Sequence, residues 1–125
     1  MKKVLASIFT VALILAGIPA NAQFYGGIVG STGTPTVTSC GSSPSLSANS
    51  IDHAGRITVG GGLLVTSCTL NFSATLAGTT RCTIVPYGLL ISPLISSITE
   101  SSTGFTVNFI STIAGATIDY SCFIN

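Results

Sequence analysis

Residues 67–76, Ser-Cys-Thr-Leu-Asn-Phe-Ser-Ala-Thr-Leu, alternate between polar and apolar side chains. The even positions from Cys68 to Leu76 are apolar, and the odd positions carry hydroxyl or amide groups. Because successive side chains of a strand point to opposite faces, a period of two predicts a half-buried β-strand. Nothing beyond residue 22 shows a convincing helical period, so the sequence predicts an all-β protein.

Further strands are predicted on both sides of this segment. Each is short, rich in β-branched or aromatic residues and bounded by turn residues: 37–40, 56–59, 82–86, 95–102, 105–111 and 117–124. The Ser/Pro-rich stretch 41–49 and the segments 77–80, 101–104 and 114–116 are typical of turns. Six or seven short strands at regular spacing predict a small antiparallel β-sandwich, jelly-roll-like in character.

The first 22 residues have the three-part layout of a bacterial secretory signal peptide. Lys2 and Lys3 precede the apolar stretch 4–16, and Ala20-Asn21-Ala22 places small residues at a cleavage site. The apolar stretch is shorter than the roughly 18 residues that span a bilayer. We therefore expect an exported protein, secreted or periplasmic, with no membrane partner after cleavage. We expect residues 23–35 to be a flexible Gly/Thr-rich lead or linker and residues 36–125 to form a single disulfide-bonded β-domain.

Charged side chains are scarce in this chain. The 125 residues include four Lys or Arg and three Asp or Glu, and removal of Lys2 and Lys3 takes the formal net charge from +1 to −1. Without a basic patch, nucleic-acid binding by phosphate neutralisation is excluded. A surface of Ser, Thr, Asn and Gly instead suits self-association into a homo-oligomer, or contact with an uncharged glycan or cell-surface partner.

The four cysteines predict two disulfides, because an even count in a short exported chain is typical of a disulfide framework. The count leaves three pairings open. Cys82 and Cys122 fall on inward positions of predicted strands, which favours the pair Cys82–Cys122 and leaves Cys40–Cys68. No two cysteines lie two to four residues apart, as the usual zinc sites require. We predict no metal and no cofactor.

Few residues are suited to acid–base or nucleophilic chemistry. On an extended strand the neighbours Asp52 and His53 would point to opposite faces, so Asp52 is better interpreted as a turn residue that caps backbone amides. Asp52, Glu100 and Asp119 fall on separate predicted elements, which argues against the paired carboxylates of a glycosidase. We expect no enzyme, with a small secreted hydrolase or inhibitor as the alternative.

Two tyrosines are candidate binding residues. Tyr120 shares an inward pattern with Ile118 and Cys122, whereas Tyr25 and Tyr87 are expected at the surface. An exposed aromatic ring can pack against a sugar ring, so these two residues suggest a glycan contact. Packing or subunit contact is the alternative.

The order of short motifs over residues 36–123 resembles a known type of domain. The motifs are Thr36-Val-Thr-Ser-Cys40-Gly-Ser-Ser-Pro-Ser-Leu46, Asp52-His-Ala-Gly-Arg-Ile-Thr-Val-Gly60, Thr66-Ser-Cys-Thr-Leu-Asn-Phe72, Cys82-Thr-Ile-Val-Pro86, Thr103-Gly-Phe-Thr-Val-Asn-Phe109 and Ile118-Asp-Tyr-Ser-Cys122. They resemble a small β-domain near the C-termini of phage tail-fibre and tailspike-like proteins and of some bacterial surface proteins. The resemblance implies a structural or receptor-contacting module, often trimeric, without catalytic activity. The signal peptide and the lack of a fibre shaft favour a free exported protein.

These observations together predict an exported, non-enzymatic structural or binding module that self-associates. Two alternatives remain open. One is a pilus-type subunit completed by donor-strand exchange, with the apolar segment 23–29 as the donated strand. The other is a small secreted glycan-binding protein.

Overall fold

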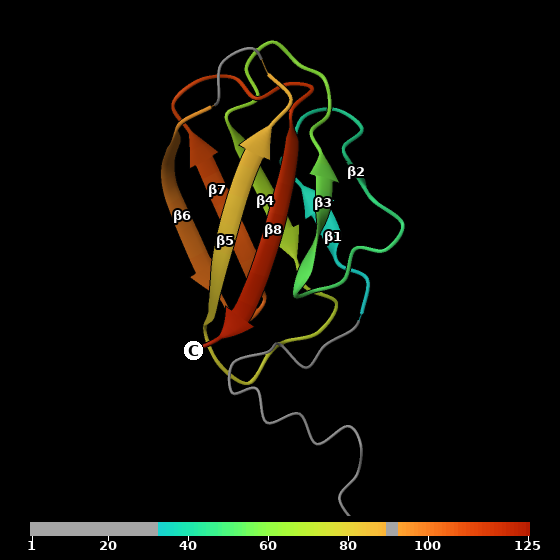
Figure 1. The fold of residues 1–125 in the computed structure, drawn as a ribbon, viewed down its shortest axis with the longest axis vertical. Coiled ribbons are helices and arrows are strands. Elements are labelled where there is room, and N and C mark those ends of the chain that lie inside the picture. The colour runs from blue at the N-terminus through green and yellow to red at the C-terminus, as the bar shows by residue number, and fades with distance from the viewer. Residues whose placement is uncertain (1–32, 90–92) are drawn as a thin grey trace, which may run out of the picture.

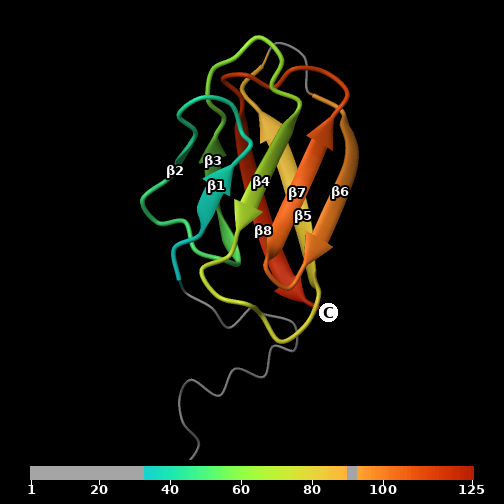
Figure 2. The same ribbon diagram turned by 180° about the vertical axis from the view of Figure 1, so that it is seen from behind.

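The computed structural model describes residues 33–89 and 93–125, which form eight strands and no helix. Two four-stranded antiparallel sheets pack face to face (Figures 1 and 2). Sheet I has the order β1 (Thr36–Thr38), β4 (Ser67–Asn71), β7 (Gly104–Phe109), β6 (Ile95–Ser101). Sheet II has the order β2 (Ser45–Leu46), β3 (Ala54–Thr58), β8 (Thr117–Ile124), β5 (Thr80–Tyr87). The predicted all-β sandwich is confirmed.

The signal peptide, most of the predicted lead and Tyr25 lie outside the described residues. In the ranges that are described, the chain contains no helix long and apolar enough to cross a membrane.

The hydrophobic core lies between the two sheets. Its four largest fully buried strand residues are one from each central strand: Ile57, Leu70, Val107 and Ile118. Phe105 of sheet I packs against Tyr120 of sheet II with ring centroids 5.7 Å apart. The inward pattern predicted for residues 105–109 and 118–122 is confirmed, because alternate residues of β7 and β8 are buried.

The strand predicted over residues 68–76 is shorter in the structure. β4 ends at Asn71, and the inward alternation stops at Phe72, since Ala74 is exposed. The Phe72 N–H still donates to the Thr103 carbonyl in the β6–β7 turn of sheet I over 2.9 Å. The Ser73 N–H then donates over 2.8 Å to the carboxylate of Asp52, which precedes β3 of sheet II, and this contact takes the chain away from sheet I.

The first predicted strand is also shorter, because β1 ends at Thr38 and Ser39 takes a left-handed φ of 51°. The chain then crosses from sheet I to sheet II. Along this crossing the Gly60 N–H donates to the Cys40 carbonyl over 2.9 Å. A Cβ on Gly60 would collide with the Ser42 backbone, so only glycine allows this close approach.

Two disulfides join the pairs that the sequence analysis favoured. Cys82 and Cys122 are directly opposite on β5 and β8, with Cα atoms 4.1 Å apart. Cys40, two residues after the end of β1, is bonded to Cys68 on β4, with Cα atoms 4.2 Å apart. Bridging of all four cysteines indicates an oxidising, extracytoplasmic location.

Candidate functional site

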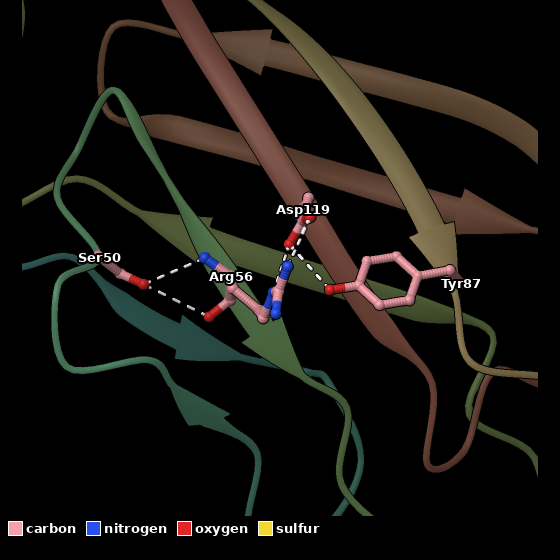
Figure 3. A network of polar contacts seen from close by, with 4 residues as sticks. All are labelled: Ser50, Arg56, Tyr87 and Asp119. Atoms are coloured by element: carbon pink, nitrogen blue, oxygen red, sulfur yellow. Dashed lines mark hydrogen bonds and ion pairs between the residues drawn. The ribbon is translucent and has the colours of Figure 1, made fainter.

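An ion pair stands on the outer face of sheet II (Figure 3). Arg56 on β3 and Asp119 on β8 are register partners, so their side chains lie side by side on the same face. Arg56 donates from Nε to Oδ1 over 2.7 Å and from Nη2 to Oδ2 over 3.0 Å. Both side chains are exposed to solvent, by 53% and 41%.

Tyr87 completes this cluster from the neighbouring strand β5. It sits diagonally across from Asp119, because its own register partner is Thr117. The Tyr87 hydroxyl donates to Asp119 Oδ1 over 3.4 Å, and Arg56 Cζ lies 5.2 Å from the Tyr87 ring centroid. This distance is that of a cation–π contact. Three adjacent strands thus contribute one residue each to what we call the Arg56 cluster: Arg56, Tyr87 and Asp119.

The contacts within the Arg56 cluster fix its protonation. The hydrogen bond from Arg56 lowers the pKa of the Asp119 carboxyl, and the same bond raises the pKa of Arg56. Partial burial raises the pKa of the Tyr87 phenol. Around neutral pH the cluster therefore consists of a carboxylate, a guanidinium and a neutral phenol, and its net charge is zero.

A shallow, open hollow lies beside the ion pair. Ser50, which follows β2 in the sequence, lines this hollow and contacts the backbone of Arg56 (Figure 3). Its Oγ accepts the Arg56 N–H over 3.1 Å and donates to the Arg56 carbonyl over 3.4 Å. The hollow has a volume of about 460 Å³. It is lined by Ser47, Asn49, Ser50, Ala54, Gly55, Arg56, Asp119 and Tyr120. Hydroxyl and amide groups thus surround the charged pair.

The cluster keeps spare hydrogen-bonding capacity. A guanidinium has five N–H donors, and the two bonds to Asp119 use one on Nε and one on Nη2, so three donors remain outside the ion pair. A carboxylate offers about four acceptor positions. Donors and acceptors therefore stand next to each other on one exposed face, beside the Tyr87 ring.

The other predicted site residues have structural partners. Asp52 is fully buried and accepts from the Ser73 N–H and, over 2.6 Å, from the Ser73 hydroxyl. Asp52 lies in a turn, as predicted, but the backbone amide that it caps belongs to the β4–β5 connection and not to its own turn. His53 lies in the turn before β3, where its carbonyl accepts the Cys122 N–H over 2.7 Å.

Glu100 bridges the edges of the two sheets. From β6 it accepts the Cys82 N–H of β5, and its other oxygen lies 3.3 Å from Arg81 Nη1. The three carboxylates Asp52, Glu100 and Asp119 thus stand on three different elements with different partners. Among the described residues, no group of three or more His, Cys, Asp or Glu side chains is placed to hold a metal ion.

Sequence reasoning identified Tyr87 but missed Arg56 and Asp119 as its neighbours. Arg56 and Asp119 are 63 positions apart, and only the β3–β8 register brings them together. One signal was available: each occupies an outward position of a predicted strand, and the two carry opposite charges in a chain with few charges.

Comparisons with known proteins give no relative. No protein-family model matches the chain, and neither a curated protein nor a solved structure matches it. The fold and the site define a small, disulfide-bonded β-sandwich with an exposed Arg–Asp–Tyr cluster on one sheet face.

Proposed function

We propose that this protein is an exported, non-enzymatic binding module that contacts neutral carbohydrate through the Arg56 cluster. The observation that carries the proposal is the exposed Arg56–Asp119 pair, flanked by the Tyr87 ring and by a hollow whose lining includes Ser47 and Asn49. Sugar hydroxyls both donate and accept hydrogen bonds, so they complement neighbouring guanidinium and carboxylate groups. The apolar C–H face of a sugar ring packs against an aromatic side chain.

The charge of the cluster favours an uncharged ligand. An anion would be attracted by Arg56 and repelled by Asp119 at nearly the same distance, and a cation would meet the reverse. A neutral polyhydroxylated ligand is repelled by neither group. The surrounding Ser47 and Asn49 side chains add uncharged hydrogen-bonding groups at the rim of the hollow.

The arrangement of the carboxylates supports binding rather than catalysis. A glycosidase needs two carboxyl groups that face each other across the scissile bond. Here Asp119 is engaged by Arg56, Glu100 by the Cys82 N–H, and Asp52 by Ser73. Each carboxylate thus serves its own local contact.

Affinity electrophoresis tests the proposal. The protein is run through gels that contain one soluble neutral polysaccharide each, such as dextran, galactomannan, xyloglucan or mixed-linkage glucan. We expect at least one polysaccharide to retard the wild type. Tyr87→Ala should weaken this binding at least tenfold, whereas Tyr87→Phe, which keeps the ring, should retain most of it.

Phe123→Ala is the matched control, because Phe123 is an exposed aromatic residue of β8 on the same sheet face but outside the Arg56 cluster. Its binding should equal that of the wild type. Failure of every polysaccharide to retard the protein, or equal retardation of Tyr87→Ala, would overturn the proposal.

A second candidate function is self-association through sheet I. In register, Thr38, Thr69, Thr106 and Thr99 form one row across all four strands, and the outward positions of this sheet in the described residues bear no charge. An uncharged face does not repel a second copy. Sedimentation velocity should show a mass that rises with concentration, and Thr106→Lys should abolish the rise. A strict monomer at all concentrations would contradict it.

The donor-strand alternative has less support. The described residues already supply four strands to each sheet and a core enclosed between them. The segment 23–29, which that alternative requires as the donated strand, lies outside the described residues.

A further inference from the structure

Four strongly exposed apolar side chains gather at one end of the sandwich. They belong to the three connections that follow β3, β5 and β7, at the end opposite the C-terminus (Figure 1). The exposed fractions are 96% for Leu63, 85% for Leu64, 67% for Leu94 and 69% for Ile110. We call these four residues the apolar tip. Exposed apolar groups that cluster in this way mark contact surfaces, whereas single ones are ordinary.

Backbone hydrogen bonds tie the three connections together beneath the apolar tip. The Ile110 N–H donates to the Leu94 carbonyl over 3.0 Å, and the Ile113 N–H donates to the Val65 carbonyl over 2.7 Å. The side chains of Val65 and Ile113 are buried in the core directly below. The leucines therefore project from connections that are linked to one another and to the core.

The described part of these three connections carries no charge. Residues 59–66, 88–89, 93–94 and 110–116 include no Asp, Glu, Lys or Arg. Burying a charged side chain in an apolar medium is costly, and this end has none to bury. The tip can therefore leave water without a charge penalty.

The shape of the tip argues against a protein partner such as a second copy. Side chains that project need an apolar socket, yet each of two hollows on the described surface is lined in part by hydroxyl or charged side chains. A stable protein interface also uses roughly 20 to 30 residues on each side, far more than four. A lipid surface accepts projecting apolar side chains without a matching cavity.

We infer that the apolar tip inserts into a lipid surface, with Leu63 and Leu64 entering deepest because they are the most exposed. The contact is peripheral and involves no spanning helix, and it changes the sequence-based expectation of no membrane partner. It uses the end of the sandwich, while the Arg56 cluster lies on the outer face of sheet II. The two sites are therefore separable by mutation.

Tryptophan fluorescence tests this inference directly, because the chain contains no tryptophan. Leu64→Trp in the full chain is mixed with vesicles of phosphatidylcholine. We expect a blue shift of the emission and quenching by lipids brominated on the acyl chain. Phe123→Trp is the control, since Phe123 is exposed on the face of sheet II, and its emission should not change. Equal behaviour of the two variants, with no shift, would overturn the inference.

Vesicle flotation gives the second measurement. The Leu63→Ser, Leu64→Ser double variant should float at least tenfold less than the wild type, and Leu64→Met should float normally. Added phosphatidylglycerol should not raise flotation, nor added salt lower it, because the tip has no cation. Binding that requires anionic lipid, or loss of self-association rather than flotation in the double variant, would overturn the inference. Tyr87→Ala should float normally, so failure here is distinct from failure of the carbohydrate proposal.

Discussion

The buried carboxylate of Asp52 links two connections that are 21 positions apart. It accepts both the backbone N–H and the hydroxyl of Ser73. Asp52→Ala removes both hydrogen bonds and leaves a buried space, so we expect a loss of about 2–3 kcal/mol of unfolding free energy. Urea denaturation followed by tyrosine fluorescence measures this loss. Asp52→Asn, which keeps one acceptor oxygen, should lose less; an equal loss would show that the acceptor is not the cause.

The Arg56–Asp119 pair makes stability depend on pH in the acid range. The pKa of folded Asp119 lies below the unfolded value of about 3.9, so its contribution is present above that value and is lost as pH falls through the folded pKa. The contribution is small because the pair is exposed and screened. Thermal denaturation between pH 5 and 2 should therefore show a shallower acid loss for Asp119→Asn than for the wild type. If the stability of Asp119→Asn and of the wild type fell equally with pH, the acid dependence would not come from Asp119.

Among the elements, the edge strand β5 depends on a side chain from the other sheet. Because β5 is at the edge of sheet II, no neighbouring strand of that sheet pairs with its outer side. Glu100 of β6 accepts the Cys82 N–H on that side. Exposed strand edges pair with other chains, and an inward charged residue is one protection against this. Glu100→Ala should cost about 1–3 kcal/mol and increase aggregation.

Light scattering during heating measures this aggregation, and Glu100→Gln is the control because its amide oxygen can still accept the Cys82 N–H. Glu100→Gln should aggregate less than Glu100→Ala. Equal aggregation of both variants would assign the effect to the lost charge and contradict edge protection.

For the whole molecule, the two disulfides should supply much of the net stability. They close segments with sequence separations of 28 and 40. In the chain-entropy model, such loops contribute about 3.5 and about 4 kcal/mol. Paired Cys→Ser substitutions, Cys40 with Cys68 or Cys82 with Cys122, should lower the unfolding free energy by these amounts in urea denaturation. A loss below about 1 kcal/mol for either pair would contradict this account.

The sequence predicts what depends on local pattern, and the structure adds what depends on register. Alternation located β8, and inward positions favoured the Cys82–Cys122 pair, because both signals lie within single strands. The end of β4 was missed because a distant contact, from Ser73 to Asp52, determines it. The Arg56 cluster was missed for the same reason, since it requires the pairing of three strands.

The central claim is that the Arg56 cluster binds neutral carbohydrate. Two-dimensional NMR of the ¹⁵N-labelled protein, titrated with an oligosaccharide of the polysaccharide that retards it, tests this claim most directly. We predict that saturable shift changes concentrate at Arg56, Tyr87 and Asp119 and at the rim residues Ser47 and Asn49. Shift changes confined to sheet I or to the apolar tip, or no saturable change at all, would contradict the claim.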